Sequence, residues 1–224
     1  MDKKNKLMRT LGGLIAAGGL MVAGVGFGYG VPAAVNGLES AQALYAAQGV
    51  NLSYNAEGEL VDRGAAEGAQ NIMNLLEGEW DYPVNYKNFD PEDPLVNTRD
   101  ELMYQFATIS YHVMHTEVAV TLAEDQLPLE YRGETYTEPG EYMIAVEKSY
   151  AQLDRTHPIE SQLRAAWSPQ ALGLLSSLSA GHANQAAGEL ALAAGAGVGG
   201  LGLLVAAGGA GMYLANKDYK PKKE

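Results

Sequence analysis

The pattern of hydrophobic residues divides the chain into two long apolar runs and a mixed segment between them. Residues 11–35 and 190–214 carry no charged side chain and are interrupted mainly by small residues. At ~1.5 Å of rise per residue, either run is long enough to cross a hydrocarbon core of ~30 Å as a helix. We therefore expect a transmembrane helix near each end of the chain. Residues 36–189 are numerous enough to form one compact domain with its own core.

Glycines recur four residues apart in both apolar runs. The spacing is found in three pairs, Gly24 with Gly28, Gly26 with Gly30, and Gly195 with Gly199. In lipid, small residues at this spacing let two helix backbones approach closely, which is how helices associate there without a hydrophobic driving force. We predict that these glycines pack against another helix, either the second apolar run or a helix of a partner membrane protein.

The middle segment is predicted to be mainly α, with one or two small β-hairpins. Apolar residues recur at helical spacing in five stretches, at residues 39–48, 65–76, 98–122, 158–167 and 169–179. Alternating residues around glycine-containing turns predict hairpins at residues 50–61 and 129–136. Residues 142–153 fit either a short helix or a strand followed by a helix.

The helix predicted for residues 98–122 has the clearest start. Thr98 and Glu101 have the spacing of a capping box, in which each side chain accepts a hydrogen bond from the backbone of the other. Apolar residues such as Leu102, Phe106 and Ile109 cover much of its circumference. We therefore expect this helix at the centre of the domain.

Charge is distributed unevenly along the chain. The tails, residues 1–10 and 215–224, each carry four basic side chains, against one and two acidic ones. Residues 36–189 carry 24 acidic and 7 basic side chains, a formal charge of −17. Lys and Arg beside a membrane span are retained in the cytoplasm. The pattern thus predicts a two-pass protein of the cell membrane, with both termini cytoplasmic and the acidic domain extracytoplasmic.

The first apolar run has a second interpretation. A basic start, an apolar stretch and the small-residue sequence Val31-Pro32-Ala33 are also features of a secretory signal peptide. Residues 11–35 are long for such a signal, so we favour an uncleaved anchor. Cleavage of this segment stays open as the alternative.

Few residues point to catalysis or cofactor binding. The chain has no cysteine, which excludes cysteine-based zinc, iron–sulfur and thiol chemistry. Neither a nucleophile elbow nor a P-loop is present, and no cofactor is expected from any motif. His112 and His115 lie one helical turn apart and could share a metal ion with a third, remote ligand. We favour partly buried, hydrogen-bonded histidines, with metal binding as the alternative.

The acidity of residues 36–189 favours a basic partner protein and argues against nucleic acid, whose phosphates it would repel. A connection rich in proline, aromatic and acidic residues offers side chains of the kind found at protein contacts. The candidate partner-binding residues are Trp80, Tyr82, Tyr86, Asp90, Glu92 and Asp93.

In its two spans, its size and its division of charge, the chain resembles the small accessory subunits of actinobacterial respiratory supercomplexes. This resemblance implies a non-catalytic scaffold subunit that sits in the lipid bilayer beside other membrane subunits. Its acidic outer surface would face a basic extracytoplasmic protein, such as an electron carrier. Two alternatives remain. One is a metal-binding envelope protein or metalloenzyme using His112 and His115, and the other is a receptor whose concave acidic pocket takes a cationic ligand.

Overall fold

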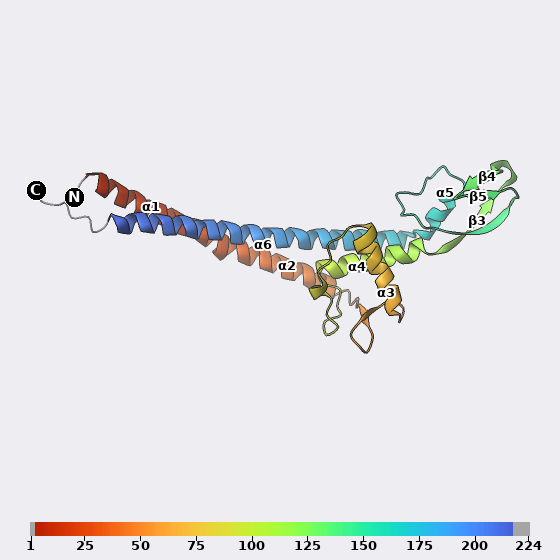
Figure 1. Cartoon of the computed structure of the whole chain (residues 1–224), viewed down its shortest axis with the longest axis horizontal. Helices are drawn as coiled ribbons and strands as arrows, with labels where there is room; N and C mark the ends of the chain where they lie inside the picture. Colours follow the sequence, from red (N-terminus) through yellow and green to blue (C-terminus); the bar gives the residue numbers. More distant parts are fainter. Residues whose placement is uncertain (1–2, 217–224) are drawn as a thin grey trace, which may run out of the picture. The chain divides into compact units, whose positions relative to one another are not determined.

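The computed structural model describes residues 3–216, so nearly all of the predicted basic tail 215–224 lies outside the described residues. The chain forms two compact units (Figure 1). We call the first, Met1–Leu44 with Ala183–Glu224, the helix pair, and the second, Tyr45–His182, the central unit.

The helix pair is built from long apolar helices that run antiparallel to each other. Its elements are α1 (Lys3–Val25), a π-helical turn (Gly26–Gly30), most of α2 (Val31–Ala46) and the second half of α6 (Pro169–Ala215). Pro32 has no N–H to continue a regular helix, and the wider π-turn directly precedes it. Segments Lys4–Ala46 and Pro169–Ala215 are long and apolar enough to cross a membrane. Both predicted runs lie inside them.

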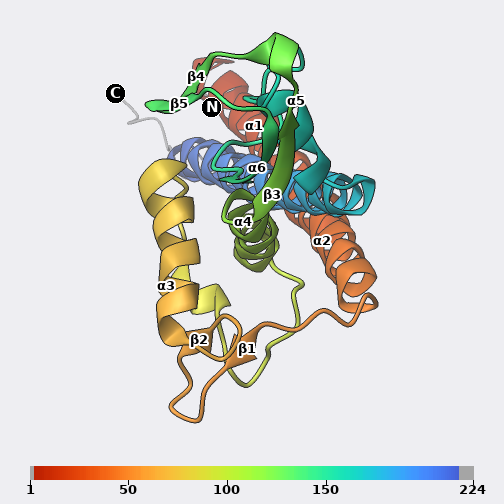
Figure 2. The same cartoon turned by 90° about the vertical axis from the view of Figure 1, so that its right-hand side faces the viewer.

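The first half of the central unit packs around α4 (Arg99–Met114). A hairpin of β1 (Ser53–Tyr54) and β2 (Leu60–Val61) leads into α3 (Ala66–Asn74), which lies beside α4 (Figure 2). A π-helical turn (Leu75–Glu79) and a 3-10 turn (Tyr86–Asn88) follow α3. The fully buried residues of this core include Ile72, Leu76 and Ala107. The predicted helix 65–76 and hairpin 50–61 are confirmed.

The second half of the central unit packs around an antiparallel pair of strands. β3 (Glu117–Leu122) pairs with β6 (Gly140–Ala145), with Val120 opposite Tyr142. The predicted hairpin at 129–136 is confirmed as β4 (Leu129–Tyr131) and β5 (Glu134–Tyr136). Short helical turns are found at Glu124–Gln126, in α5 (Glu160–Leu163) and at Arg164–Ala166. The start of α6 covers a core that contains Val120, Val146, Ile159 and Leu163.

The predicted helix 98–122 is correct at its start and wrong at its end. The capping box is formed, because Glu101 N–H donates to Thr98 Oγ1 at 3.4 Å and Thr98 N–H donates to Glu101 Oε2 at 2.8 Å. The helix ends at Met114, and residues 117–122 form strand β3 instead. Val120 and Leu122 are buried while Ala119 and Thr121 are exposed, the period of two that a half-buried strand requires.

Three further features differ in part from what the sequence predicts. The structure is mainly helical and contains the two predicted hairpins, and within residues 3–216 it has a third antiparallel strand pair, β3 with β6, that was not expected. For residues 142–153 the strand of the second alternative is found, since the segment begins in β6, but the helix that both alternatives contained is wrong, because the chain continues without one to Leu153. Helix 169–179 and the second apolar run belong to one helix, α6, because residues 182–189 contain no proline to end it.

Candidate functional site

A seam of small residues joins α1 to α6 in the helix pair. A Cβ added at Gly19 would lie 2.3 Å from the Ala206 nitrogen and 2.6 Å from the Gly202 oxygen. A Cβ at Gly26 would lie 2.3 Å from the Gly199 nitrogen, and one at Gly12 would lie 2.8 Å from the oxygen of Gly209. The two backbones therefore meet at distances that leave no room for a side chain.

Four of the six glycines predicted to pack against a helix lie in this seam. Gly26 and Gly30 approach Gly195, and Gly199 lies under the Phe27 ring. Gly24 and Gly28 meet nothing within 4 Å and lie outside the seam. A seven-residue spacing of glycines would have predicted the seam better, because residues seven apart lie on the same face of a helix, as in coiled coils. It is present in both helices, at Gly12, Gly19 and Gly26 and at Gly195, Gly202 and Gly209.

The surface of the helix pair away from the seam is apolar. Its large exposed side chains include Leu14, Leu20 and Met21 of α1, and Leu201, Leu204 and Val205 of α6. At the end of the pair near the chain termini, the Arg9 guanidinium donates to the Tyr213 hydroxyl at 3.1 Å and lies 5.0 Å from the ring centroid. Arg and Tyr are typical of a membrane–water boundary.

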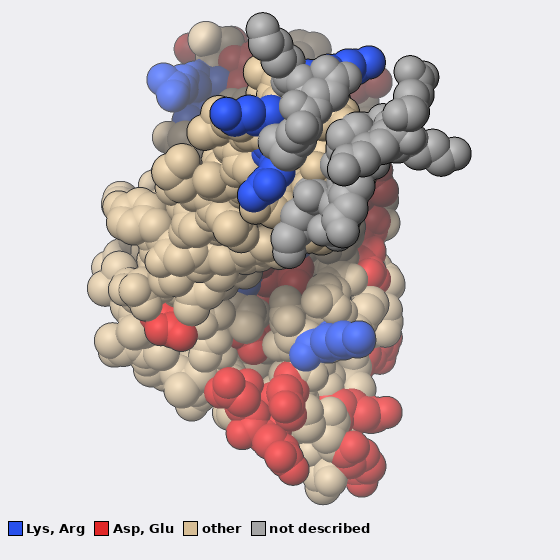
Figure 3. Space-filling view, turned by 90° about the vertical axis from the view of Figure 1, so that its left-hand side faces the viewer, with Lys and Arg blue, Asp and Glu red and all other residues tan. Residues whose placement is uncertain are grey.

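In the central unit, two turns place five carboxylates together. We call Glu57, Glu59, Asp90, Glu92 and Asp93 the acidic patch. The β1–β2 turn touches the loop at residues 90–93, since a Cβ at Gly58 would lie 3.5 Å from Pro91 Cγ. Figure 3 shows acidic side chains gathered at the lower end of the face it presents. Burial, together with the charges of Glu101, Asp90 and Asp93, raises the pKa of nearby Tyr54 to about 12.

The three predicted partner-binding aromatics differ in accessibility. Trp80 packs edge-on against Phe106, with ring centroids 5.7 Å apart. The Tyr82 hydroxyl donates to Asp100 Oδ1 at 2.9 Å, and burial and this hydrogen bond raise the pKa of Tyr82 to about 12. Tyr86 is 58% exposed and donates to Glu77 Oε2 at 2.6 Å. Of the three, Tyr86 is the most available to another protein.

The two predicted metal ligands have separate partners. His112 Nε2 lies 3.0 Å from Asp62 Oδ1. His115 Nδ1 lies 2.8 Å from the Tyr111 carbonyl oxygen, and its ring stacks on the Tyr111 ring with centroids 3.9 Å apart. Within residues 3–216, no group of three or more His, Asp or Glu side chains is placed to hold a metal ion. No specific observation therefore favours the metal-binding alternative.

A cleft between the two cores of the central unit was not anticipated from the sequence. It has a volume of about 540 Å³ and is lined by side chains of α4, α6 and the segment at 147–152, together with Glu79, Trp80 and Trp167. Its residues are far apart in the chain, so no local pattern could have brought them together.

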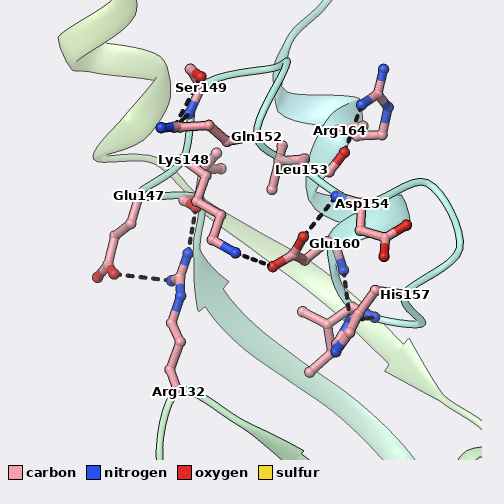
Figure 4. Close-up of polar contacts among 12 residues, drawn as sticks. Arg132, Glu147, Lys148, Ser149, Gln152, Leu153, Asp154, His157, Glu160 and Arg164 are labelled. Carbon is pink, nitrogen blue, oxygen red and sulfur yellow. Dashed lines mark hydrogen bonds and ion pairs between the residues drawn. The ribbon is translucent and has the colours of Figure 1, made fainter.

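One wall of this cleft, residues 147–152, is held by a polar network (Figure 4). Arg132 pairs with Glu147 at 3.1 Å and donates to the carbonyl oxygens of Ala145 and Val146 at 2.8 and 2.7 Å. Lys148 pairs with the buried Glu160. Burial opposes ionisation of Glu160, but hydrogen bonds from Lys148 and from a backbone N–H outweigh it and lower the pKa of Glu160.

Further contacts fix the remainder of the wall. Arg164 donates to the carbonyl oxygens of Tyr150 and Leu153, both at 2.9 Å, and its guanidinium lies 3.7 Å from the Tyr150 ring centroid. The Trp167 indole N–H donates to the Lys148 carbonyl at 3.2 Å. These contacts within the chain hold the wall in place, so it is preformed and needs no ligand to order it.

Comparison of the chain with protein-family models, with curated proteins and with solved structures finds no match.

Proposed function

We propose that this chain is a non-catalytic, two-pass membrane subunit that presents an acidic extracytoplasmic surface to a basic partner protein. The observation that carries the proposal is the contrast between the surfaces of the two units. The helix pair exposes bulky apolar side chains, and the central unit carries 22 acidic against 7 basic residues. The apolar surface of the helix pair suits lipid and the helices of other membrane subunits, and the acidic surface of the central unit suits water and cations.

The seam supports membrane anchoring because it uses the packing that helices adopt in lipid. Small residues allow close van der Waals contact between backbones, and this contact needs no hydrophobic driving force. From Gly12 to Gly30 the seam extends over 19 residues of α1 and the π-turn, and the 18 steps between them span roughly 27 Å at 1.5 Å per residue. That length is close to the ~30 Å thickness of a hydrocarbon core. Large apolar side chains on the outer surface complete the anchor.

The acidic patch supports the choice of a basic partner. Glu57, Glu92 and Asp93 are exposed and gather with Glu59 and Asp90 in two touching turns. Like charges held this close attract a cationic protein and raise its rate of encounter, within a Debye length of ~8–10 Å. Tyr86, which is largely exposed, lies in the same connection and can supply apolar contact area. In keeping with the resemblance stated above, a respiratory complex with a basic electron carrier is the partner we propose to test first.

The test is purification from native membranes in mild detergent. We expect the tagged full-length chain to copurify with other membrane subunits and with a basic protein that dissociates as salt is raised. Recovery as a lone monomer would count against the proposal.

A charge-neutralised variant makes this experiment specific to the acidic patch. In Glu57→Gln, Glu92→Gln and Asp93→Asn combined, the basic protein should be lost at lower salt, while the membrane subunits stay bound. The matched control neutralises three exposed carboxylates elsewhere in the central unit, Glu117, Glu124 and Glu130. If both triple variants weaken the association equally, overall charge is responsible and the acidic patch is not the contact surface.

A further inference from the structure

The geometry points to the cleft of the central unit as a binding site for a small organic cation with an apolar body, such as an alkylated ammonium carrying an aromatic group. The cleft's volume of about 540 Å³ falls in the range of roughly 300–1,000 Å³ typical of ligand pockets. This site is independent of the acidic patch and of the function proposed above.

Aromatic side chains supply the binding surface for such a cation. Trp80, Phe106 and Trp167 line the cleft, and these include both tryptophans of the chain. The Tyr150 ring also lines it but already carries the Arg164 guanidinium. An indole face attracts an ammonium group more strongly than other aromatic rings do, and this attraction grows as water is excluded. Leu172 and other apolar side chains complete the lining and can cover the apolar part of the ligand.

The charge of the cleft selects for a cation. Glu79 and Glu147 line it, and no Lys or Arg among residues 3–216 does. The basic side chains of adjoining segments have partners of their own: Lys148 pairs with Glu160, and Arg164 donates to two backbone carbonyl oxygens and covers one face of the Tyr150 ring. Arg132 partly neutralises Glu147, which leaves Glu79 as the carboxylate whose charge most favours a ligand cation.

The backbone at Glu147 is held in a fixed conformation by its surroundings. Its backbone adopts the left-handed conformation, with φ of 51°, that non-glycine residues rarely adopt. Its N–H donates to the Met114 carbonyl at 2.8 Å, which ties the wall to the end of α4. Backbone strain of this kind persists only where the surroundings enforce it, and it is concentrated at functional sites. A preformed cleft loses less entropy on binding than a flexible one.

The experiment titrates the full-length protein, in neutral detergent, with three aromatic probes and follows tryptophan fluorescence. Because both tryptophans of the chain line the cleft, a ligand bound there lies beside every indole that contributes to the signal. Benzyltrimethylammonium should give a saturable change, with an affinity about tenfold higher than that of neutral benzyl alcohol. Anionic benzenesulfonate should bind more weakly still. Absence of a saturable change with the cation, or equal binding of the neutral probe, would overturn the inference.

Two variants locate the charge that selects the cation. Glu79→Gln should lower the affinity for benzyltrimethylammonium about three- to tenfold and leave that for benzyl alcohol unchanged. Glu124→Gln is the matched control, because it removes the same charge from an exposed position outside both the cleft and the acidic patch and should have no effect. Circular dichroism confirms that both variants are folded. If Glu79→Gln binds the cation as tightly as the unmodified protein does, the cleft does not select by charge and the inference is wrong.

Discussion

Replacing Gly19 by alanine should weaken the helix pair, whereas the same change one residue earlier, at Gly18, should not. At Gly19 the new Cβ would lie 2.3 Å from the Ala206 nitrogen and 2.6 Å from the Gly202 oxygen, and both atoms belong to the backbone of α6. At Gly18 nothing lies within 4 Å. The two positions are adjacent in the same helix, so the comparison isolates the seam.

The magnitude follows from the separation that the new methyl group would force. Atoms in ordinary contact are about 3.5–4.0 Å apart, so α1 and α6 would have to separate by roughly 1 Å near Gly19. A gap of that size forfeits about a quarter to a half of the attraction of each affected contact. Inserting extra atoms into a well-packed contact destabilises by about 1–3 kcal/mol. We therefore expect Gly19→Ala to destabilise the helix pair by about 2 kcal/mol relative to Gly18→Ala. Both variants gain the same helix propensity, which cancels in the difference.

The assay is unfolding of the helix pair by added sodium dodecyl sulfate, followed by energy transfer between two dyes. The chain has no cysteine, so Asn5→Cys and Asn216→Cys give two unique labels at the end of the pair where Arg9 meets Tyr213. Gly19→Ala should lower the midpoint of the transition and Gly18→Ala should leave it unchanged or raise it. Equal midpoints for the two variants would refute the close backbone contact between α1 and α6 at Gly19.

Three further predictions concern the central unit. Thr98→Ala removes the capping hydrogen bond to Glu101 N–H and should lower its free energy of unfolding by about 1 kcal/mol, measured by urea titration. Val120→Asp buries a charge in the second core and should unfold that half of the central unit. Ala119→Asp lies on the exposed face of β3 and should change the melting temperature little. Similar melting temperatures for the two variants would contradict the strand register. Because the pKa of Glu160 is lowered in the folded protein, its contribution to stability is present above the ordinary pKa of about 4.3 and is lost as pH falls through the folded value. Glu160→Gln should therefore reduce the acid-induced loss of stability between about pH 5 and pH 3, and an unchanged profile would show that this carboxyl is not responsible.

Features encoded by neighbouring residues were predictable from the sequence. The capping box at Thr98 depends on residues three apart, and the hairpin at Arg132-Gly133 depends on two residues with positive φ, 50° and 80°. The two apolar runs are recognisable by composition alone. In each case the interaction that forms the element lies within a few residues of the signal.

Features that depend on distant residues were missed. Residues 117–122 become a strand because they pair with β6, whose paired residues lie 18 to 28 positions further along the sequence, and this pairing overrides the apolar pattern that favoured a longer helix. The cleft likewise joins Trp80 to Trp167, which no local spacing connects. For Gly24 and Gly28, which do not meet α6, packing against a helix of a partner protein stays a prediction, because a four-residue spacing indicates a smooth helix face but not which neighbour it meets.

The most direct test of the proposed function is the orientation of the chain in intact cells. Single cysteines at Glu57, in the acidic patch, and at Asn5, in the first turns of α1, give one label on each side of the proposed membrane. A membrane-impermeant thiol reagent applied to intact cells should modify Glu57→Cys fully and Asn5→Cys only after the cells are opened. Modification of Asn5→Cys in intact cells, with Glu57→Cys protected, would contradict a two-pass anchor with an acidic extracytoplasmic surface.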